Sequence, residues 1–138
     1  TTEGGLDVVK QKEMIKDAIE RLHKGRIKVS LFIEPEAEQV KATKEVGADM
    51  VELYTGTYAE ASSPEEEERE FNRLFKAAQL AGELGLEVRA GHSLTFRNLR
   101  RITTLPNLTE VSIGHNIIAR AVLLGLDKAV KEVLAILH

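Results

Sequence analysis

Residues 86–95 read LEVRAGHSLT and residues 109–118 read TEVSIGHNII, so the chain twice ends a short apolar run on a Gly-His pair. Two similar runs precede them, IKVSLFI at 27–33 and DMVELYT at 49–55. All four are short and rich in Val, Ile and Leu, which is typical of buried β-strands. Segments with helical periodicity separate them. Strands that alternate with helices predict right-handed βαβ crossovers and a parallel sheet, that is, an α/β fold.

Helices are expected on both sides of each strand. The first is expected over about 7–24, with Asp7 as its cap and Gly25 beyond its end. The others are expected at 36–46, from Ser63-Pro64 onward, at 96–104 and at 116–137, the last with an interruption at Gly125. No linker or low-complexity segment divides the chain, so residues 1–138 are expected to form one domain.

Composition excludes several classes of function. The chain has 138 residues, of which 43% are hydrophobic and 30% charged, as is ordinary for a soluble globular protein. The net charge of -3 gives no electrostatic case for nucleic-acid binding. No apolar run is long enough to span a membrane and no signal peptide is visible, so we expect a cytoplasmic protein. The absence of Cys excludes disulfides and thiolate metal sites.

Polar residues gather where the predicted strands end, which is where parallel α/β folds place their chemistry. Glu52 lies inside the apolar stretch MVELYTG, where an unpaired buried carboxylate is costly. In an open sheet Glu52 faces solvent, whereas in a barrel it points into the mouth and suits a charge-stabilising role. Arg89, in LEVRAG, is expected to pair with Glu52 on the neighbouring strand or with a phosphate.

The two Gly-His pairs suggest different chemistry. His92 follows a strand, where it either transfers protons near neutral pH or is satisfied by loop backbone. His115 follows Gly114 at the start of the last helix, whose free N–H groups form an anion site. No HxH or HExxH spacing is present, so no metal site is expected. Glycine motifs for nucleotide binding are absent too.

Five segments together resemble the pyridoxine 5′-phosphate synthase family of vitamin B6 biosynthesis: TTEGGLDV, VSLFIEP, VELYTGTYAEA, AGHSLT and IGHNIIARAVLLGL. The resemblance runs over essentially the whole chain, in order. It implies a (βα)8 barrel, of which this chain is the C-terminal half, strands five to eight with the preceding helix, because a full barrel needs about 250 residues. The N-terminal half would carry a general-base His, a second acid–base Glu and Arg residues that bind substrate.

The resemblance also implies roles for five residues. Glu52 matches a carboxylate that stabilises the transition state, and His92 matches a proton donor. Ser93 and the pair Gly114-His115 match the site for 3-amino-2-oxopropyl phosphate. The family condenses this compound with 1-deoxy-D-xylulose 5-phosphate into pyridoxine 5′-phosphate, phosphate and water, without a metal or organic cofactor. The partners it implies are these phosphorylated substrates, the other half-barrel and further copies in a homo-oligomer.

Two departures from the family motif, which is close to NAGHGL, keep alternatives open. Ser93 replaces a Gly, and Arg89 replaces an Asn. The first hypothesis is a synthase whose strands one to four belong to the same protein or to another chain. The second is a free-standing or engineered half-barrel that self-associates and has little or no catalysis. The third is a phosphate-binding module that uses only Gly114-His115.

Overall fold

Four parallel strands form one sheet in the order β1-β2-β3-β4. The computed structural model describes residues 4–137 of the chain. The strands are β1 (Ser30–Ile33), β2 (Met50–Tyr54), β3 (Glu87–Gly91) and β4 (Leu108–Ser112). The predicted parallel α/β fold is confirmed, and strands that follow one another in both sequence and space are consistent with half of a (βα)8 barrel.

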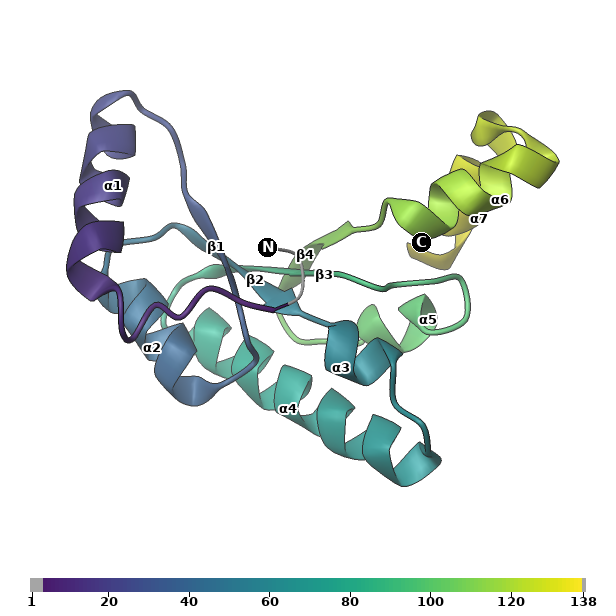
Figure 1. Cartoon of the computed structure of the whole chain (residues 1–138), viewed down its shortest axis with the longest axis horizontal. Coiled ribbons are helices and arrows are strands. Elements are labelled where there is room, and N and C mark those ends of the chain that lie inside the picture. The colour runs from purple at the N-terminus through teal and green to yellow at the C-terminus, as the bar shows by residue number, and fades with distance from the viewer. Residues whose placement is uncertain (1–3, 138) are drawn as a thin grey trace.

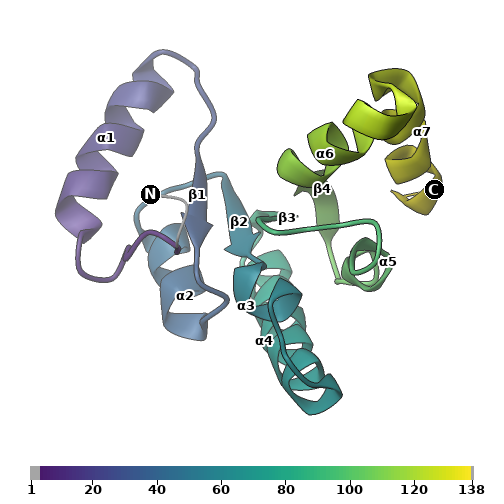
Figure 2. The same ribbon diagram turned by 45° about the vertical axis from the view of Figure 1, so that its right-hand side comes forward.

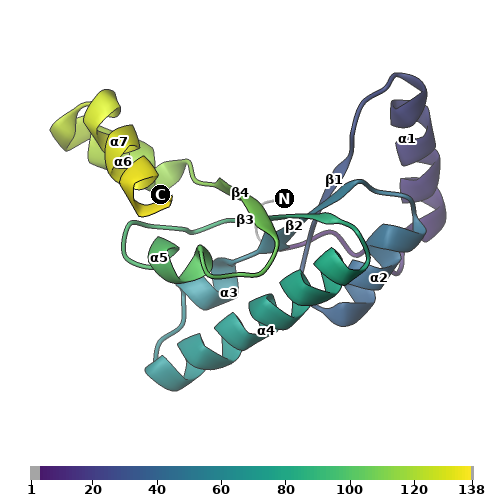
Figure 3. The same ribbon diagram turned by 180° about the vertical axis from the view of Figure 1, so that it is seen from behind.

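Helices follow or precede every strand, and α2 and α4 cover one face of the sheet (Figure 1, Figure 3). The helices are α1 (Lys12–Lys24), α2 (Ala37–Glu45), α3 (Gly56–Ala59), α4 (Pro64–Glu83), α5 (Leu99–Ile102), α6 (His115–Leu124) and α7 (Leu126–Leu137). Helix α4 begins at the predicted Ser63-Pro64. Helix α1 begins at Lys12 rather than near 7, because the Asp7 carboxylate accepts from Lys10 N and from Gln39 Nε2 of α2 and so closes a turn before the helix.

The core lies between the sheet and these helices. Alternate strand residues point toward α2 and α4, and six of them are buried: Leu31, Ile33, Val51, Leu53, Val88 and Ala90. From the helices, Val40, Leu74 and Ala78 meet them and are 0–1% exposed. Burial of each large aliphatic side chain contributes about 1.5–3 kcal/mol, so this aliphatic layer holds the sheet in place.

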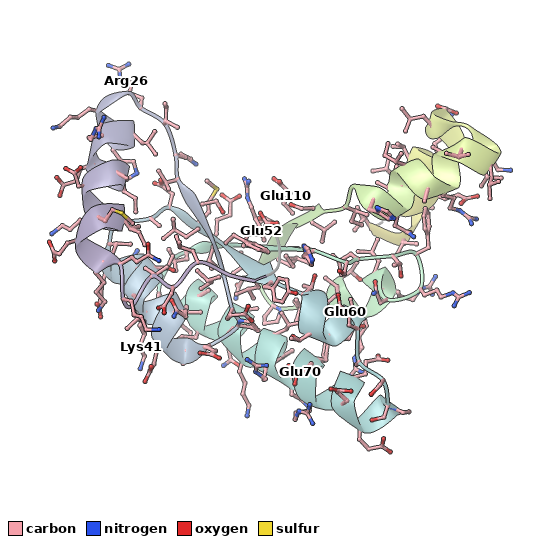
Figure 4. The ribbon with its side chains drawn as sticks, in the orientation of Figure 1. Arg26, Lys41, Glu52, Glu60, Glu70 and Glu110 are labelled. Carbon is pink, nitrogen blue, oxygen red and sulfur yellow. The ribbon has the colours of Figure 1, made fainter. Side chains whose placement is uncertain are left out.

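The opposite face of the sheet is open. Strand register puts Phe32, Glu52, Arg89 and Glu110 at one level and on one face. Figure 4 shows Glu52 and Glu110 on the side away from α4. In a closed barrel this face would line the lumen.

Residues 4–6 lie along the outer edge of β1. The Met50 N–H of β2 donates to Val29 O. In residues 29–33 the backbone N–H and C=O groups of the odd-numbered residues therefore point toward β2, and Phe32 O points away from it. Leu6 N donates to Phe32 O over 2.7 Å at this outer edge. Gly5 approaches so closely that a Cβ on it would lie 2.3 Å from Glu34 N, so a larger residue does not fit here.

The chain ends in a helical hairpin that projects from the end of β4 (Figure 2). Gly125 has φ +84 and separates α6 from α7, where the sequence predicted an interruption. No residue of α6 is buried, and Val122 and Leu123 are more than 80% exposed. Helix α7 buries Ala129 and Val133. Across residues 4–137, no helix combines the length and the apolar composition that crossing a membrane requires.

Candidate functional site

A cleft of about 510 Å³ opens between the loops that follow β3 and β4. Its lining comes from two segments: His92, Ser93, Leu94 and Thr95, and Ser112, Ile113, Gly114, His115 and Asn116. The structure thus brings four of the five predicted site residues, His92, Ser93, Gly114 and His115, to one cleft. The reason is topological, since β3 and β4 are adjacent and parallel and their carboxyl ends lie side by side.

The turn after β3 has an unusual backbone. His92 has φ +89 and Ser93 has φ +55, a region that L-residues rarely occupy. Glycine adopts such angles without steric cost. Ser93 therefore places a side chain on a backbone conformation that glycine adopts most readily. Asn98 Nδ2 reaches Ser93 O at 3.4 Å from the far side of the loop.

The His92 ring lies between the cleft and the open face of the sheet. Its centroid is 5.0 Å from the Tyr54 ring, at an interplanar angle of 40°, and 6.5 Å from the Phe32 ring. Tyr54 and Phe32 pack edge to face, 5.7 Å apart. These two residues belong to β2 and β1, so three strands contribute to the setting of one imidazole. Stacking of this kind restricts the ring orientation.

Glu52 does not line the cleft but lies next to it. It is half-buried on the open face of β2, two residues before Tyr54. A Cβ placed on Gly91 would lie 2.4 Å from Glu52 Oε1. The Glu52 carboxylate therefore occupies the space that a side chain at position 91 would fill. Gly91 directly precedes His92 in the chain. Glu52 therefore lies beside Gly91, the residue that leads into the His92 turn.

The predicted pairing of Arg89 with Glu52 is wrong. Arg89 Nη2 forms ion pairs with Glu110 Oε2 at 3.2 Å and with Glu87 Oε1 at 3.3 Å. Glu110 lies opposite Arg89 on β4, and Glu87 lies two residues earlier on the same face of β3. The guanidinium therefore turns toward β4 and the amino ends of the strands, away from Glu52. Its Nε is buried without a partner among the described residues.

The first turn of α6 forms the other wall of the cleft. Gly114 is the N-cap residue, and the helix begins at His115 and runs for 10 residues. The leading N–H groups of a helix have no acceptor within it, and together with the helix dipole they attract anions. Asn116 Oδ1 accepts from Phe96 N over 3.2 Å and so ties this turn to the loop after β3. The cleft can therefore take a phosphate-sized anion.

Comparison with known proteins decides the family. The model of the pyridoxal phosphate biosynthesis protein PdxJ family matches residues 1–138. The chain belongs to the PdxJ family. It is 49% identical over 132 residues to the pyridoxine 5′-phosphate synthase of Magnetococcus marinus. The corresponding identities are 50% for Geobacter sulfurreducens and 51% for a Synechococcus species.

These matches cover 96% of this PdxJ-family chain but only 54% of the Magnetococcus protein and 55% of the other two. The chain thus spans about half the length of the curated relatives it matches. The predicted family resemblance is confirmed. Pyridoxal phosphate is the coenzyme form of vitamin B6, so membership assigns the chain to vitamin B6 biosynthesis.

Two features of this PdxJ-family site were not predicted from the sequence. The ring of Tyr54 contacts the ring of His92. Thr55 directly follows β2, and its hydroxyl lies within hydrogen-bond distance of the Gly91 and His92 carbonyl oxygens. Its position directly after an apolar strand was the available signal. Within residues 4–137, no group of three or more His, Asp or Glu side chains is arranged to hold a metal ion.

Proposed function

We propose that this chain supplies the proton donor and a phosphate site of a pyridoxine 5′-phosphate synthase. The reaction condenses 3-amino-2-oxopropyl phosphate with 1-deoxy-D-xylulose 5-phosphate and releases pyridoxine 5′-phosphate, phosphate and water. One observation carries the proposal: His92, Ser93, Gly114 and His115 line a single cleft beside Glu52. The names of the relatives support it.

Each residue has a role that fits its position. His92 donates a proton during condensation, since imine formation, dehydration and ring closure all require proton transfer. Glu52 stabilises the positive charge that develops as the imine forms. Ser93, Gly114 and His115 hold the phosphate of the aminoketone at the start of α6. Side chains suffice for these steps, so we propose no metal or organic cofactor.

Catalysis in this proposal also requires a second set of strands. The open face of the sheet and the outer edge of β4, where Thr109 and Glu110 are exposed, would be covered by the other half of a (βα)8 barrel. That half would supply the remaining acid–base groups and the groups that bind the pentulose phosphate. Assembly of the closed barrel into a homo-oligomer is part of the same proposal.

The test is complementation. We would produce the chain together with the segment of the Geobacter sulfurreducens synthase that it does not cover, and measure pyridoxine 5′-phosphate formed from the two substrates. We expect turnover, and we expect Glu52→Gln and His92→Asn each to reduce it by about 10²-fold or more. His23→Asn is the control. His23 lies on α1 and pairs with Asp49, the residue directly before β2, and it does not line the cleft. Near-normal rates in either site variant would remove the role assigned to that residue.

A second candidate function is a self-associating half-barrel that binds phosphate but has little or no catalysis. The open sheet face favours it, because two copies can cover each other's face with two-fold symmetry. Light scattering on the purified chain tests for self-association. The monomer mass is 15.3 kDa, so a dimer would have twice this mass. A dimer that binds phosphate, yields no product in the complementation assay and keeps its phosphate binding after His92→Ala would favour this second function.

A further inference from the structure

Thr55 makes an unusual set of contacts at the carboxyl end of β2. Its side chain is fully buried, and its Oγ1 lies 2.7 Å from Gly91 O and 2.5 Å from His92 O. Its backbone N–H also donates to Gly91 O, over 2.9 Å. A threonine hydroxyl carries one proton, so the two carbonyls share a single donor. The carbonyl groups of Gly91, the last residue of β3, and of His92, which follows it, therefore converge on the side chain that directly follows β2.

This convergence requires the chain to curl sharply after β3. In an extended strand, successive carbonyls point in opposite directions. Here they point toward the same hydroxyl, and the positive φ angles of His92 and Ser93 directly follow. Each such residue costs on the order of 1–3 kcal/mol and persists only where surrounding contacts hold it. The shared hydroxyl of Thr55 is a contact of this kind.

The neighbouring residue holds the ring of the same histidine. Tyr54 and Thr55 are consecutive and so point to opposite sides of β2. The Tyr54 ring packs 5.0 Å from the His92 ring, while Thr55 bonds to the His92 backbone. Because the Thr55 side chain is 0% exposed and does not line the cleft, it can affect a substrate only through the residues that it contacts, of which His92 lines the cleft.

We infer that Thr55 is a positioning residue, whose hydroxyl holds the turn at Gly91-His92 so that the His92 imidazole is presented at the mouth of the cleft. The inference rests on the proposed function for the importance of His92 in turnover. The positioning itself rests only on the contacts within this chain.

The first experiment tests the positioning without any enzyme assay. We would prepare two matched pairs of the chain, Thr55 against Thr55→Val and Thr55→Ser against Thr55→Ala; within each pair the main difference is the hydroxyl. The probe is the set of NMR resonances of the His92 ring, which are sensitive to the nearby Tyr54 ring. We expect these resonances to move in the Val and Ala variants and to stay near their original positions in the Ser variant. If one variant does not fold, the other pair gives the same comparison.

Unchanged His92 resonances in a folded Val or Ala variant would overturn the inference. So would equal movement in the Ser and Ala variants, because the hydroxyl would then make no difference.

The second experiment measures kinetics in the complementation assay. We expect Thr55→Val to reduce kcat by about tenfold or more, since misplacement of an acid–base group by about 1 Å is enough for such losses. We expect the KM for 3-amino-2-oxopropyl phosphate to change little and Thr55→Ser to restore kcat. A Val variant that is less stable but keeps its kcat would overturn the inference. If the unsubstituted assembly shows no turnover, the proposed function fails, while the NMR comparison still decides the role of Thr55.

Discussion

At the residue scale, Gly91 determines where the carboxylate of Glu52 can lie. A methyl group at this position would stand 2.4 Å from Glu52 Oε1 and 2.8 Å from Ser112 Cβ. We therefore expect Gly91→Ala to keep the fold, by circular dichroism, but to reduce turnover in the complementation assay by about tenfold or more as Glu52 is displaced. Gly4→Ala is a matched control, because its Cβ would meet the Glu34 carboxylate at an ordinary 3.5 Å. Equal rates in the two variants would contradict this account of Gly91.

At the element scale, α4 shows how much one helix end contributes. Ser63 Oγ accepts from Glu66 N over 3.1 Å, and Pro64 occupies the first helical position. We expect Ser63→Ala to lower the free energy of unfolding, measured with urea, by about 1 kcal/mol, because one helical N–H loses its acceptor. Ser63→Asn should stay close to the original stability, since Asn is also a good capping residue. A loss as large with Asn as with Ala would show that capping is not the cause.

At the scale of the whole molecule, two aspartates contribute to the dependence of stability on acid pH. Hydrogen bonds from Lys10 and Gln39 lower the pKa of Asp7 from 3.8 to about 2. The Val29 N–H and then His23 lower the pKa of Asp49. Both folded-state pKa values lie below that of the unfolded chain, so these contacts stabilise the fold fully above about pH 4 and are lost as pH falls toward 2.

We therefore expect the free energy of unfolding to fall between pH 4 and pH 2. The double variant Asp7→Asn, Asp49→Asn should show a smaller fall, whereas Asp17→Asn, which changes an exposed residue of α1, should show the original fall. Urea titrations at a series of pH values provide the measurement. A double variant with the original pH dependence would show that other carboxylates cause it.

The sequence predicted the features that depend on neighbouring residues and missed those that depend on contacts between distant parts of the chain. Local patterns were sufficient for the strands and for the helix ends at Ser63-Pro64 and Gly125, because propensity and capping act over a few residues. They failed at the start of α1, where Asp7 bonds to Gln39, 32 positions away. They also failed for Arg89, whose partners depend on strand register. The Gly-His pairs indicated the cleft, but Thr55 acts through a carbonyl on another strand, which no local pattern reveals.

The placement of residues 4–6 has a consequence for any assembly at β1. Leu6 already takes Phe32 O, one of the hydrogen-bonding groups that β1 offers on its outer side. A strand that pairs with the outer edge of β1 must therefore either end before Phe32 or displace residues 4–6. A partner strand that pairs along the whole of β1 must therefore break the Leu6–Phe32 hydrogen bond, so the rate of assembly here depends on how readily residues 4–6 dissociate from β1.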